Sequence, residues 1–156
     1  MRIISGKNGG QIINIPKKFK LRPTTDRSKE GLFNIISNYF NYENLNVLDL
    51  FSGTGNISYE FASRGTKNIT VVDSNAKHVK FIKSQSKKFN FKFNIIKTDV
   101  FKYLRFCDND DLNYDIIFSD PPYDLDLKKY KAIIYKIFEF KMLKTDGIFI
   151  IEHSNK

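Results

Sequence analysis

The residues best suited to chemistry form the run Asp120-Pro121-Pro122-Tyr123, which directly follows the apolar stretch Tyr114 to Ser119. The Asp120 carboxylate and the Pro121 carbonyl can accept the two N–H bonds of an amino group on a nucleobase, which localises its lone pair on nitrogen. Proline stiffens the loop and keeps its carbonyl, and the Tyr123 ring offers a face on which an extruded base can stack. A Pro-Pro pair is also an ordinary end to a strand, but that leaves the flanking acid and aromatic unexplained. The run predicts chemistry on the amino group of a base.

A second motif, Val47 to Gly55, joins an apolar strand to a glycine turn and the start of a helix. Gly53 and Gly55 let the backbone approach a ligand closely and direct free amides toward it. This arrangement is shared by dinucleotide oxidoreductases and S-adenosylmethionine enzymes, and a glycine pair can also be no more than a tight turn. Ser58 occupies the position of the third oxidoreductase glycine, and Asp49 would repel a diphosphate but attract the cationic methionine part of S-adenosylmethionine. The motif therefore favours S-adenosylmethionine.

Two further acids stand at the carboxyl ends of predicted strands, Asp73 as the last residue of one and Asp99 just after another. Asp73 can accept both hydroxyls of a ribose, or it can simply cap a helix. Asp99 can accept the amino group of an adenine, or it can be an ordinary surface acid. Open α/β sheets bind ligands at the carboxyl ends of their strands. We therefore expect Asp49, Asp73, Asp99 and Asp120 to lie at one edge of the sheet.

The elements that must position these residues alternate in the chain. Short β-branched runs separated by segments of helical spacing predict an α/β fold, with a mostly parallel sheet covered by helices on both faces. The predicted strands are 46–51, 68–73, 92–97, 114–119 and 147–152, and the predicted helices are 55–64, 75–88 with Ser74 as cap, a short one within 99–106, and 127–141. Ahead of them we predict a β-hairpin, 2–5 with 11–15, and a helix from Asp26 to Tyr39.

Two of the predicted helices carry apolar stripes that we expect to be buried. Both stripes follow the spacing of three and four residues that places side chains on one helix face. The first comprises Leu32, Ile35, Ile36 and Tyr39, and the second comprises Tyr130, Ile133, Ile134, Ile137 and Phe138.

Composition limits the possible classes of protein. The 156 residues predict one domain, 1–156, with an N-terminal extension over 1–42 and an α/β core over 43–156. The net charge of +9 suggests a polyanionic partner, but 21 of the 26 basic residues are Lys, which AT-rich coding alone would also produce. One cysteine and two histidines offer no metal-site spacing, and no apolar run is long enough for a bilayer or a signal peptide. We expect a cytoplasmic protein with no membrane partner and no metal.

The sequence resembles the small-subunit (16S) ribosomal RNA guanine-N2 methyltransferase D family, which belongs to the class I S-adenosylmethionine-dependent methyltransferases. The Asp-Pro-Pro-Tyr motif indicates only amino methylation, since adenine-N6 methylases of DNA share it. The narrower signature is the block Arg22 to Arg27. The matching segments are Met1 to Gly6, Leu21 to Arg27 with Glu30 and Leu32-Phe33-Asn34, Asp49 to Gly55 with Ser63-Arg64-Gly65, and Asp120 to Tyr123.

The resemblance implies a Rossmann-like methyltransferase fold, S-adenosylmethionine as cofactor and guanine N2 in small-subunit ribosomal RNA as acceptor, with the RNA recognised within an assembled or assembling subunit. Asp120, Pro121, Pro122 and Tyr123 would then hold the guanine. The cofactor residues would be Asp49, Phe51, Ser52, Gly53, Thr54, Gly55, Asp73, Asp99, Val100, Arg22 and Thr24. The residues expected to contact RNA are Arg22, Arg27, Lys7 and Lys18.

The sequence departs from the family at its end. Methyltransferases of this class continue from the fifth strand into a hairpin, strands 6 and 7, whereas here Lys156 follows the predicted strand 147–152 by four residues. An unprotected edge at 147–152 favours pairing with another chain. We expect a monomer, with self-association through this edge as the alternative. Two other functions stay open: adenine-N6 methylation of DNA or another RNA, and a catalytically silent RNA-binding or assembly factor.

Overall fold

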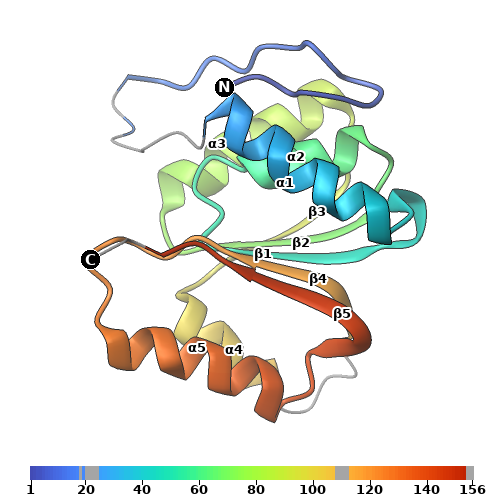
Figure 1. Ribbon diagram of the computed structural model, residues 1–156. Helices are drawn as coiled ribbons and strands as arrows, with labels where there is room; N and C mark the ends of the chain where they lie inside the picture. The colour runs from blue at the N-terminus through green and yellow to red at the C-terminus, as the bar shows by residue number, and fades with distance from the viewer. Residues whose placement is uncertain (18, 20–24, 108–112, 154–156) are drawn as a thin grey trace.

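The computed structural model describes residues 1–17, 19, 25–107 and 113–153. Its centre is a sheet of five strands in the order β3-β2-β1-β4-β5 (Figure 1), and every strand pairing in it is parallel. This confirms the predicted parallel sheet. The strands are β1 (Asn46–Leu50), β2 (Asn68–Asp73), β3 (Phe93–Lys97), β4 (Tyr114–Ser119) and β5 (Leu143–Ile151).

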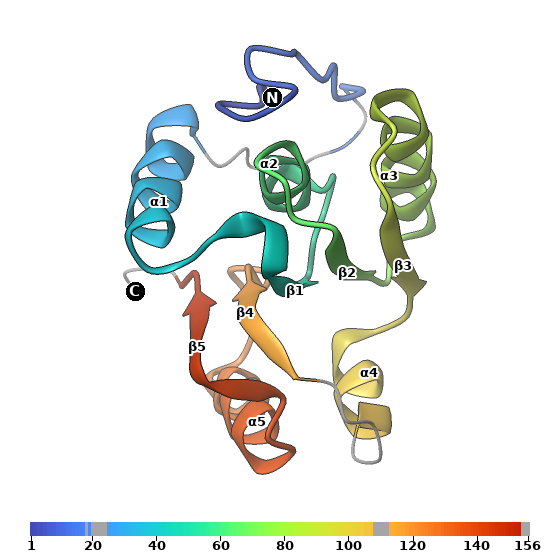
Figure 2. The same cartoon turned by 90° about the vertical axis from the view of Figure 1, so that its right-hand side faces the viewer.

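Helices cover both faces of this sheet, as Figure 2 shows most directly. One face carries α1 (Asp26–Tyr39), α2 (Asn56–Ser63) and α3 (Ala76–Phe89), and the other carries α4 (Val100–Phe106) and α5 (Leu127–Glu139). A short 3₁₀ turn, Tyr42–Asn44, leads from α1 to β1. Among the described residues, no helix combines the length and apolarity needed to cross a bilayer.

Alternate side chains of the central strands feed two separate cores, because successive residues of a strand point to opposite faces. In β1, Val47 joins the core beneath α1, α2 and α3, whereas Leu48 and Leu50 join the core beneath α4 and α5; all three are fully buried. The central strands are therefore apolar on both sides, as a doubly covered parallel sheet requires.

The N-terminal segment is held by its own backbone hydrogen bonds and by α2. Arg2 and Ile12 form one antiparallel bridge, so the predicted hairpin is reduced to a single bridge without regular strands. Besides backbone bonds across the segment, the backbone amides of Ile4 and Ser5 donate to the Glu60 carboxylate of α2, at 2.7 and 3.0 Å. The segment is thereby fixed to the α/β core.

Glu60 is fully buried, and its carboxylate also receives cations. Arg64 Nε donates to it at 2.9 Å, and the Lys29 ammonium lies 3.5 Å away. Lys29 is itself buried and donates to the Arg2 carbonyl and, at 2.9 Å, to Asn56 Oδ1. Burial lowers the pKa of the Lys29 ammonium, and the Glu60 charge opposes that shift. One buried network thus joins the N-terminal segment, α1 and α2.

This network also decides which face of α1 is buried. Lys29, Phe33 and Ile36 point inward. The predicted stripe was wrong for Ile35 and Tyr39, which are 58% and 71% exposed. The spacing of apolar residues gives no sign that Lys29 is buried next to Glu60. A smaller correction concerns α3, where the side chain of Asn75 rather than Ser74 caps the helix.

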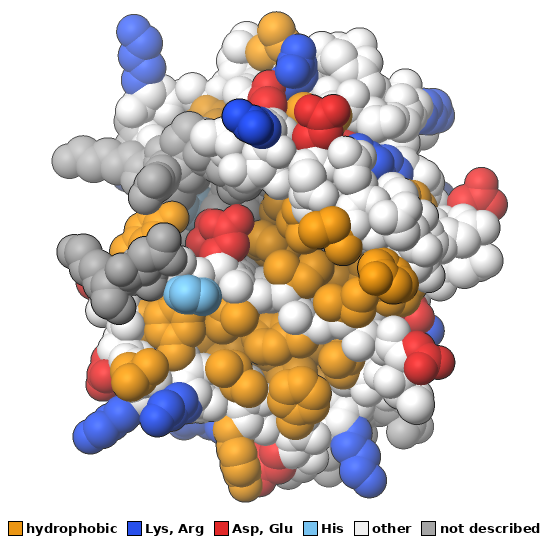
Figure 3. Space-filling view, in the orientation of Figure 1, with side chains coloured by type: hydrophobic (Ala, Val, Ile, Leu, Met, Phe, Trp, Pro, Cys, Tyr) orange, Lys and Arg blue, Asp and Glu red, His pale blue; other side chains and the backbone are white. Residues whose placement is uncertain are grey.

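Two predictions for α5 and β5 differ from the structure. Part of the predicted apolar stripe of α5 is exposed, and β5 begins earlier in the chain than predicted. Ile133 and Ile137 are fully buried, but Ile134 and Phe138 are 39% and 57% exposed. β5 begins at Leu143 instead of residue 147, with an irregular register opposite Tyr114 and Ile116 that admits the polar stretch 144–146. Figure 3 shows hydrophobic side chains gathered on the side of the molecule where β5 lies. Self-association through β5 stays a prediction.

We expect Glu60→Ala to lower the free energy of unfolding by about 3–5 kcal/mol, since it leaves buried cations and two backbone amides without their acceptor. Urea denaturation measures this. Glu30→Ala, at an exposed position of α1, is the matched control and should stay within about 0.5 kcal/mol of the parent. A loss for Glu60→Ala as small as the control's would contradict the proposed anchoring of the N-terminal segment.

Candidate active site

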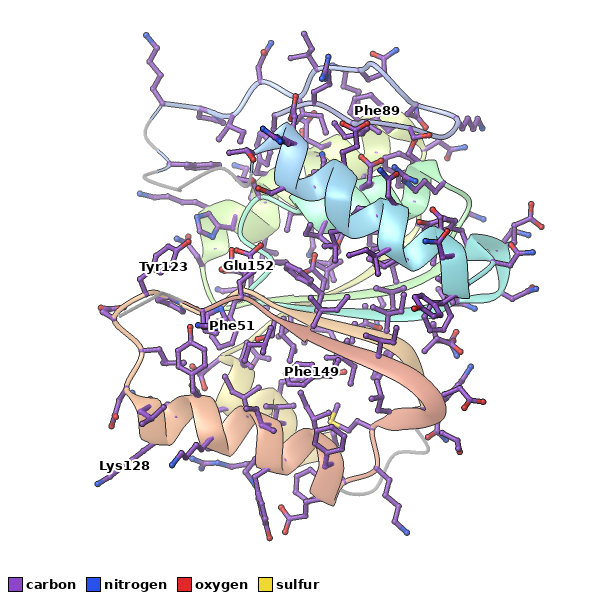
Figure 4. The ribbon with its side chains drawn as sticks, in the orientation of Figure 1. Phe51, Phe89, Tyr123, Lys128, Phe149 and Glu152 are labelled. Carbon is purple, nitrogen blue, oxygen red and sulfur yellow. The ribbon has the colours of Figure 1, made fainter. Side chains whose placement is uncertain are left out.

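A cavity of about 900 Å³ opens at the carboxyl ends of β1, β2, β4 and β5. The predicted glycine turn and the Asp-Pro-Pro-Tyr loop both line it, together with part of the N-terminal segment and the start of α1. Figure 4 shows Phe51, Tyr123 and Glu152 at this end of the sheet. The lining residues from the turn and loop are Asp49, Phe51, Ser52, Gly53, Thr54, Asp120, Pro121, Pro122 and Tyr123.

Asp49 lies at the base of this cavity and is 1% exposed. Ser58 Oγ of α2 donates a hydrogen bond to its carboxylate. Burial raises the pKa of the Asp49 carboxyl to about 7; the bond from Ser58 opposes this rise, and the charges of Asp120 and Asp73 add to it. The cavity thus contains a carboxyl group that an incoming cation would stabilise in its charged form.

Asp73, at the end of β2, holds the glycine turn. Its carboxylate accepts Gly53 N–H at 2.8 Å and Asn75 N–H at 2.7 Å, and His78 Nδ1 lies 3.3 Å from it. The turn is conformationally demanding, because Phe51, a non-glycine residue, adopts a φ of 56°. Gly55 has a φ of 84°, and a Cβ there would lie 3.1 Å from the Tyr59 ring. Asp73 therefore shapes the turn as well as lining the cavity.

Asp120 follows β4, and its backbone N–H donates to the Leu50 carbonyl of β1 at 3.4 Å. Burial, together with the negative charge of the neighbouring Glu152, raises the pKa of the Asp120 carboxyl to about 6. The Tyr123 side chain is 49% exposed at the mouth of the loop. The loop thus presents an acceptor with a raised pKa beside an accessible ring.

Most of the predicted cofactor residues come together, but two do not. Gly55 caps α2 next to the lining residues. Asp99 is exposed and its side chain caps α4 by accepting Lys102 N–H at 3.1 Å, and Val100 is buried in the core beneath α4 and α5. Neither lines the cavity. Asp99 therefore acts as a helix cap in this structure, and its contact with a cofactor stays a prediction.

The predicted RNA-binding residues are more dispersed. Arg27 is exposed in the first turn of α1. Two residues close to it in the chain, Thr25 and Ser28, line the cavity. Lys7 lies elsewhere, because its backbone N–H donates to the Ser63 carbonyl at the far end of α2. Lys18, Arg22 and Thr24 fall outside the described residues.

Sequence reasoning missed several lining residues. Phe19 packs edge-on against His78 and Phe81 of α3, at ring distances of 5.5 and 5.6 Å. No local pattern predicts such a long-range contact. Glu152 was findable, since it is the last residue of a predicted strand, as Asp73 is.

Comparison with known proteins bears on this geometry. A family model described as Conserved hypothetical protein 95 matches residues 1–156. A protein of Buchnera aphidicola subsp. Acyrthosiphon pisum named Ribosomal RNA small subunit methyltransferase D is 34% identical over 155 residues, which span 99% of this chain and 78% of the relative. This chain belongs to the small-subunit ribosomal RNA methyltransferase D family.

Two solved structures have a fold similar to that of this chain. The Escherichia coli protein yhhF matches with a TM-score of 0.85 at 23% identity, over all of this chain and 82% of the other. SMU.776, solved in complex with SAH, matches with a TM-score of 0.67 at 24% identity, over 81% of this chain and 34% of the other. These likenesses confirm the Rossmann-like α/β fold that the family resemblance implied.

The buried Asp49 carboxyl leads to a prediction about folding stability. Its pKa in the folded protein, about 7, exceeds the usual 3.8, so it costs stability increasingly as pH rises from 4 to 7 and fully above that. We expect Asp49→Asn to raise the free energy of unfolding at pH 8 by roughly 1–3 kcal/mol, with the gain disappearing below pH 4. Urea titrations at the two pH values measure it.

The matched control is Asp146→Asn, which removes the same charge from an exposed position. Equal effects of the two substitutions at pH 8 would show that burial of Asp49 carries no cost.

Proposed function

We propose that this protein transfers a methyl group from S-adenosylmethionine to the exocyclic N2 of a guanine in small-subunit ribosomal RNA. The observation that carries the proposal is the cavity itself, which joins the glycine turn over Asp49 to the Asp120–Tyr123 loop. The name of the Buchnera relative supports ribosomal RNA as the substrate class. The complex of SMU.776 with SAH, the demethylated form of the cofactor, supports the cofactor.

The cavity suits S-adenosylmethionine in charge and in hydrogen bonding. Asp49 supplies a buried carboxylate for the cationic methionine part, and Asp73 stands at the end of β2 where a ribose would lie. The buried Ser52 hydroxyl in the lining has no hydrogen-bond partner among the described residues, and a polar ligand would satisfy it. We propose Asp49, the 51–55 turn and Asp73 as cofactor residues. Arg22, Thr24, Asp99 and Val100 stay proposals from the family resemblance.

The cofactor supplies a methyl group on a sulfonium, whose carbon–sulfur bond breaks with its electron pair on sulfur as the acceptor nitrogen takes the methyl. The chain's part is to position and activate that nitrogen. Asp120 and the Pro121 carbonyl accept the two N2–H bonds and keep the lone pair on nitrogen. Asp120 takes the proton that N2 releases, a role that suits its raised pKa. Tyr123 stacks on the base, and Pro122 stiffens the loop.

The RNA side of the proposal depends on the surface around the cavity. Arg27 is exposed next to the lining and suits a phosphate. We propose that a monomer acts on an assembled or assembling small subunit, with Arg22 and Lys18 as further contacts. Lys7 would touch RNA only if the RNA extends along α2 beyond the cavity.

The central test combines product analysis with one substitution. Wild-type protein, S-adenosylmethionine and unmodified small subunits should give N2-methylguanosine by nucleoside mass spectrometry. Asp120→Ala should lower kcat by at least about a hundredfold, with the Kd of the cofactor, measured by calorimetry, within several-fold. N6-methyladenosine as the product would assign the adenine alternative, and near-normal turnover by the variant would refute the role of Asp120.

The pH dependence of the reaction gives a second test. Asp120 must be charged to accept the N2–H bond, and its pKa is raised to about 6. At saturating cofactor, kcat/KM for the subunit should fall about tenfold per pH unit below 6 and level off above it. The groups that face Asp120 are Glu152 after β5, Asp49 of β1 and Tyr130 of α5. A midpoint near pH 4 would contradict the assignment.

A further inference from the structure

Glu152 shares the acceptor end of the cavity with Asp120. It follows the last residue of β5, and its backbone N–H donates to the Ser119 carbonyl at 2.9 Å. Its own carbonyl accepts the Tyr130 hydroxyl of α5 at 3.2 Å. Both the backbone N–H and the carbonyl of Glu152 are therefore hydrogen-bonded. Figure 4 shows the residue at the same end of the sheet as Tyr123.

Asp120 and Glu152 lie next to each other in the cavity lining, because the residues that precede them, Ser119 and Ile151, are register partners on the neighbouring strands β4 and β5. When charged, neither carboxylate has a hydrogen to donate to the other. The pair therefore offers adjacent acceptor oxygens inside a binding cavity. A ligand that presents two neighbouring N–H donors can satisfy both of them.

Nucleobases differ in this respect. Guanine presents N2–H and N1–H side by side, so its edge offers two adjacent donors. Adenine presents N6–H beside N1, which is an acceptor. A second carboxylate next to Asp120 would accept a hydrogen bond from guanine N1, but it would face the lone pair of adenine N1.

We propose that Glu152 is the residue that selects guanine, with its carboxylate accepting N1–H while Asp120 accepts N2–H. This inference rests on the proposed function and names the specificity determinant of the same site. The role of Glu152 differs from that of Asp120: it reads the atom next to the reacting nitrogen and forms no bond with the methyl group.

The test uses 2-aminopurine, which keeps the reacting amino group of guanine but has an acceptor in place of N1–H. Small subunits are reconstituted with RNA that carries either guanine or 2-aminopurine at the methylated position. We expect wild-type protein to prefer guanine by about 10- to 100-fold in kcat/KM. Glu152→Gln, whose amide can donate to the acceptor, should reduce this preference to within about threefold or reverse it.

Two controls separate recognition from folding. Glu152→Asp keeps the charge and should retain a preference for guanine, and Glu139→Gln removes a charge from the outer surface of α5 and should behave as wild type. Melting temperatures of all variants should agree within a few degrees. If Glu152→Gln binds the cofactor with the same Kd as wild type, the change in base preference comes from recognition of the RNA.

The outcomes distinguish the two proposals. If wild-type protein does not methylate guanine N2 in these small subunits, the proposed function fails. If wild-type protein methylates guanine and Glu152→Gln keeps the wild-type preference over 2-aminopurine, the proposed function stands and the role of Glu152 is refuted.

Discussion

Repulsion among four carboxyl groups around one cavity is the constraint on which the site depends. Asp49, Asp73, Asp120 and Glu152 all line the same space. The protein moderates their repulsion with backbone N–H donors at Asp73 and a hydroxyl donor at Asp49. Burial and the repulsion that remains raise the pKa values of the Asp49 and Asp120 carboxyl groups. A cationic cofactor at one end and a donor-rich base at the other would relieve it.

The fold concentrates these acids because its sheet is parallel. Each strand ends at the same edge, so a residue that follows a strand lies near residues that follow the neighbouring strands. The order β2-β1-β4-β5 places Asp73, Asp49, Asp120 and Glu152 in that sequence along the edge. Cofactor and acceptor residues are therefore neighbours in space although more than one hundred positions separate Asp49 from Glu152 in the chain.

The N-terminal segment belongs to the site even though it lies outside the sheet. Met1, Ile15, Lys17 and Phe19 line the cavity. Their placement depends on Glu60, whose buried carboxylate fixes the backbone of Ile4 and Ser5. Lys29 extends the same network to Asn56, which also lines the cavity. An ion-pair network buried between helices thus closes one side of the site.

The sequence by itself determined the strands, the helices, the glycine turn and the Asp-Pro-Pro-Tyr loop, because each has a local pattern of apolar spacing, glycine or proline. It also predicted that Asp49, Asp73 and Asp120 share one edge, which follows from parallel strands alone. Only the tertiary structure decided that Asp99 caps α4 and does not line the cavity, that α1 turns Lys29 inward, and that Glu152 joins Asp120 in the cavity lining. Those outcomes depend on partners distant in the chain, and the energy of a buried charge is set by the groups that surround it after folding.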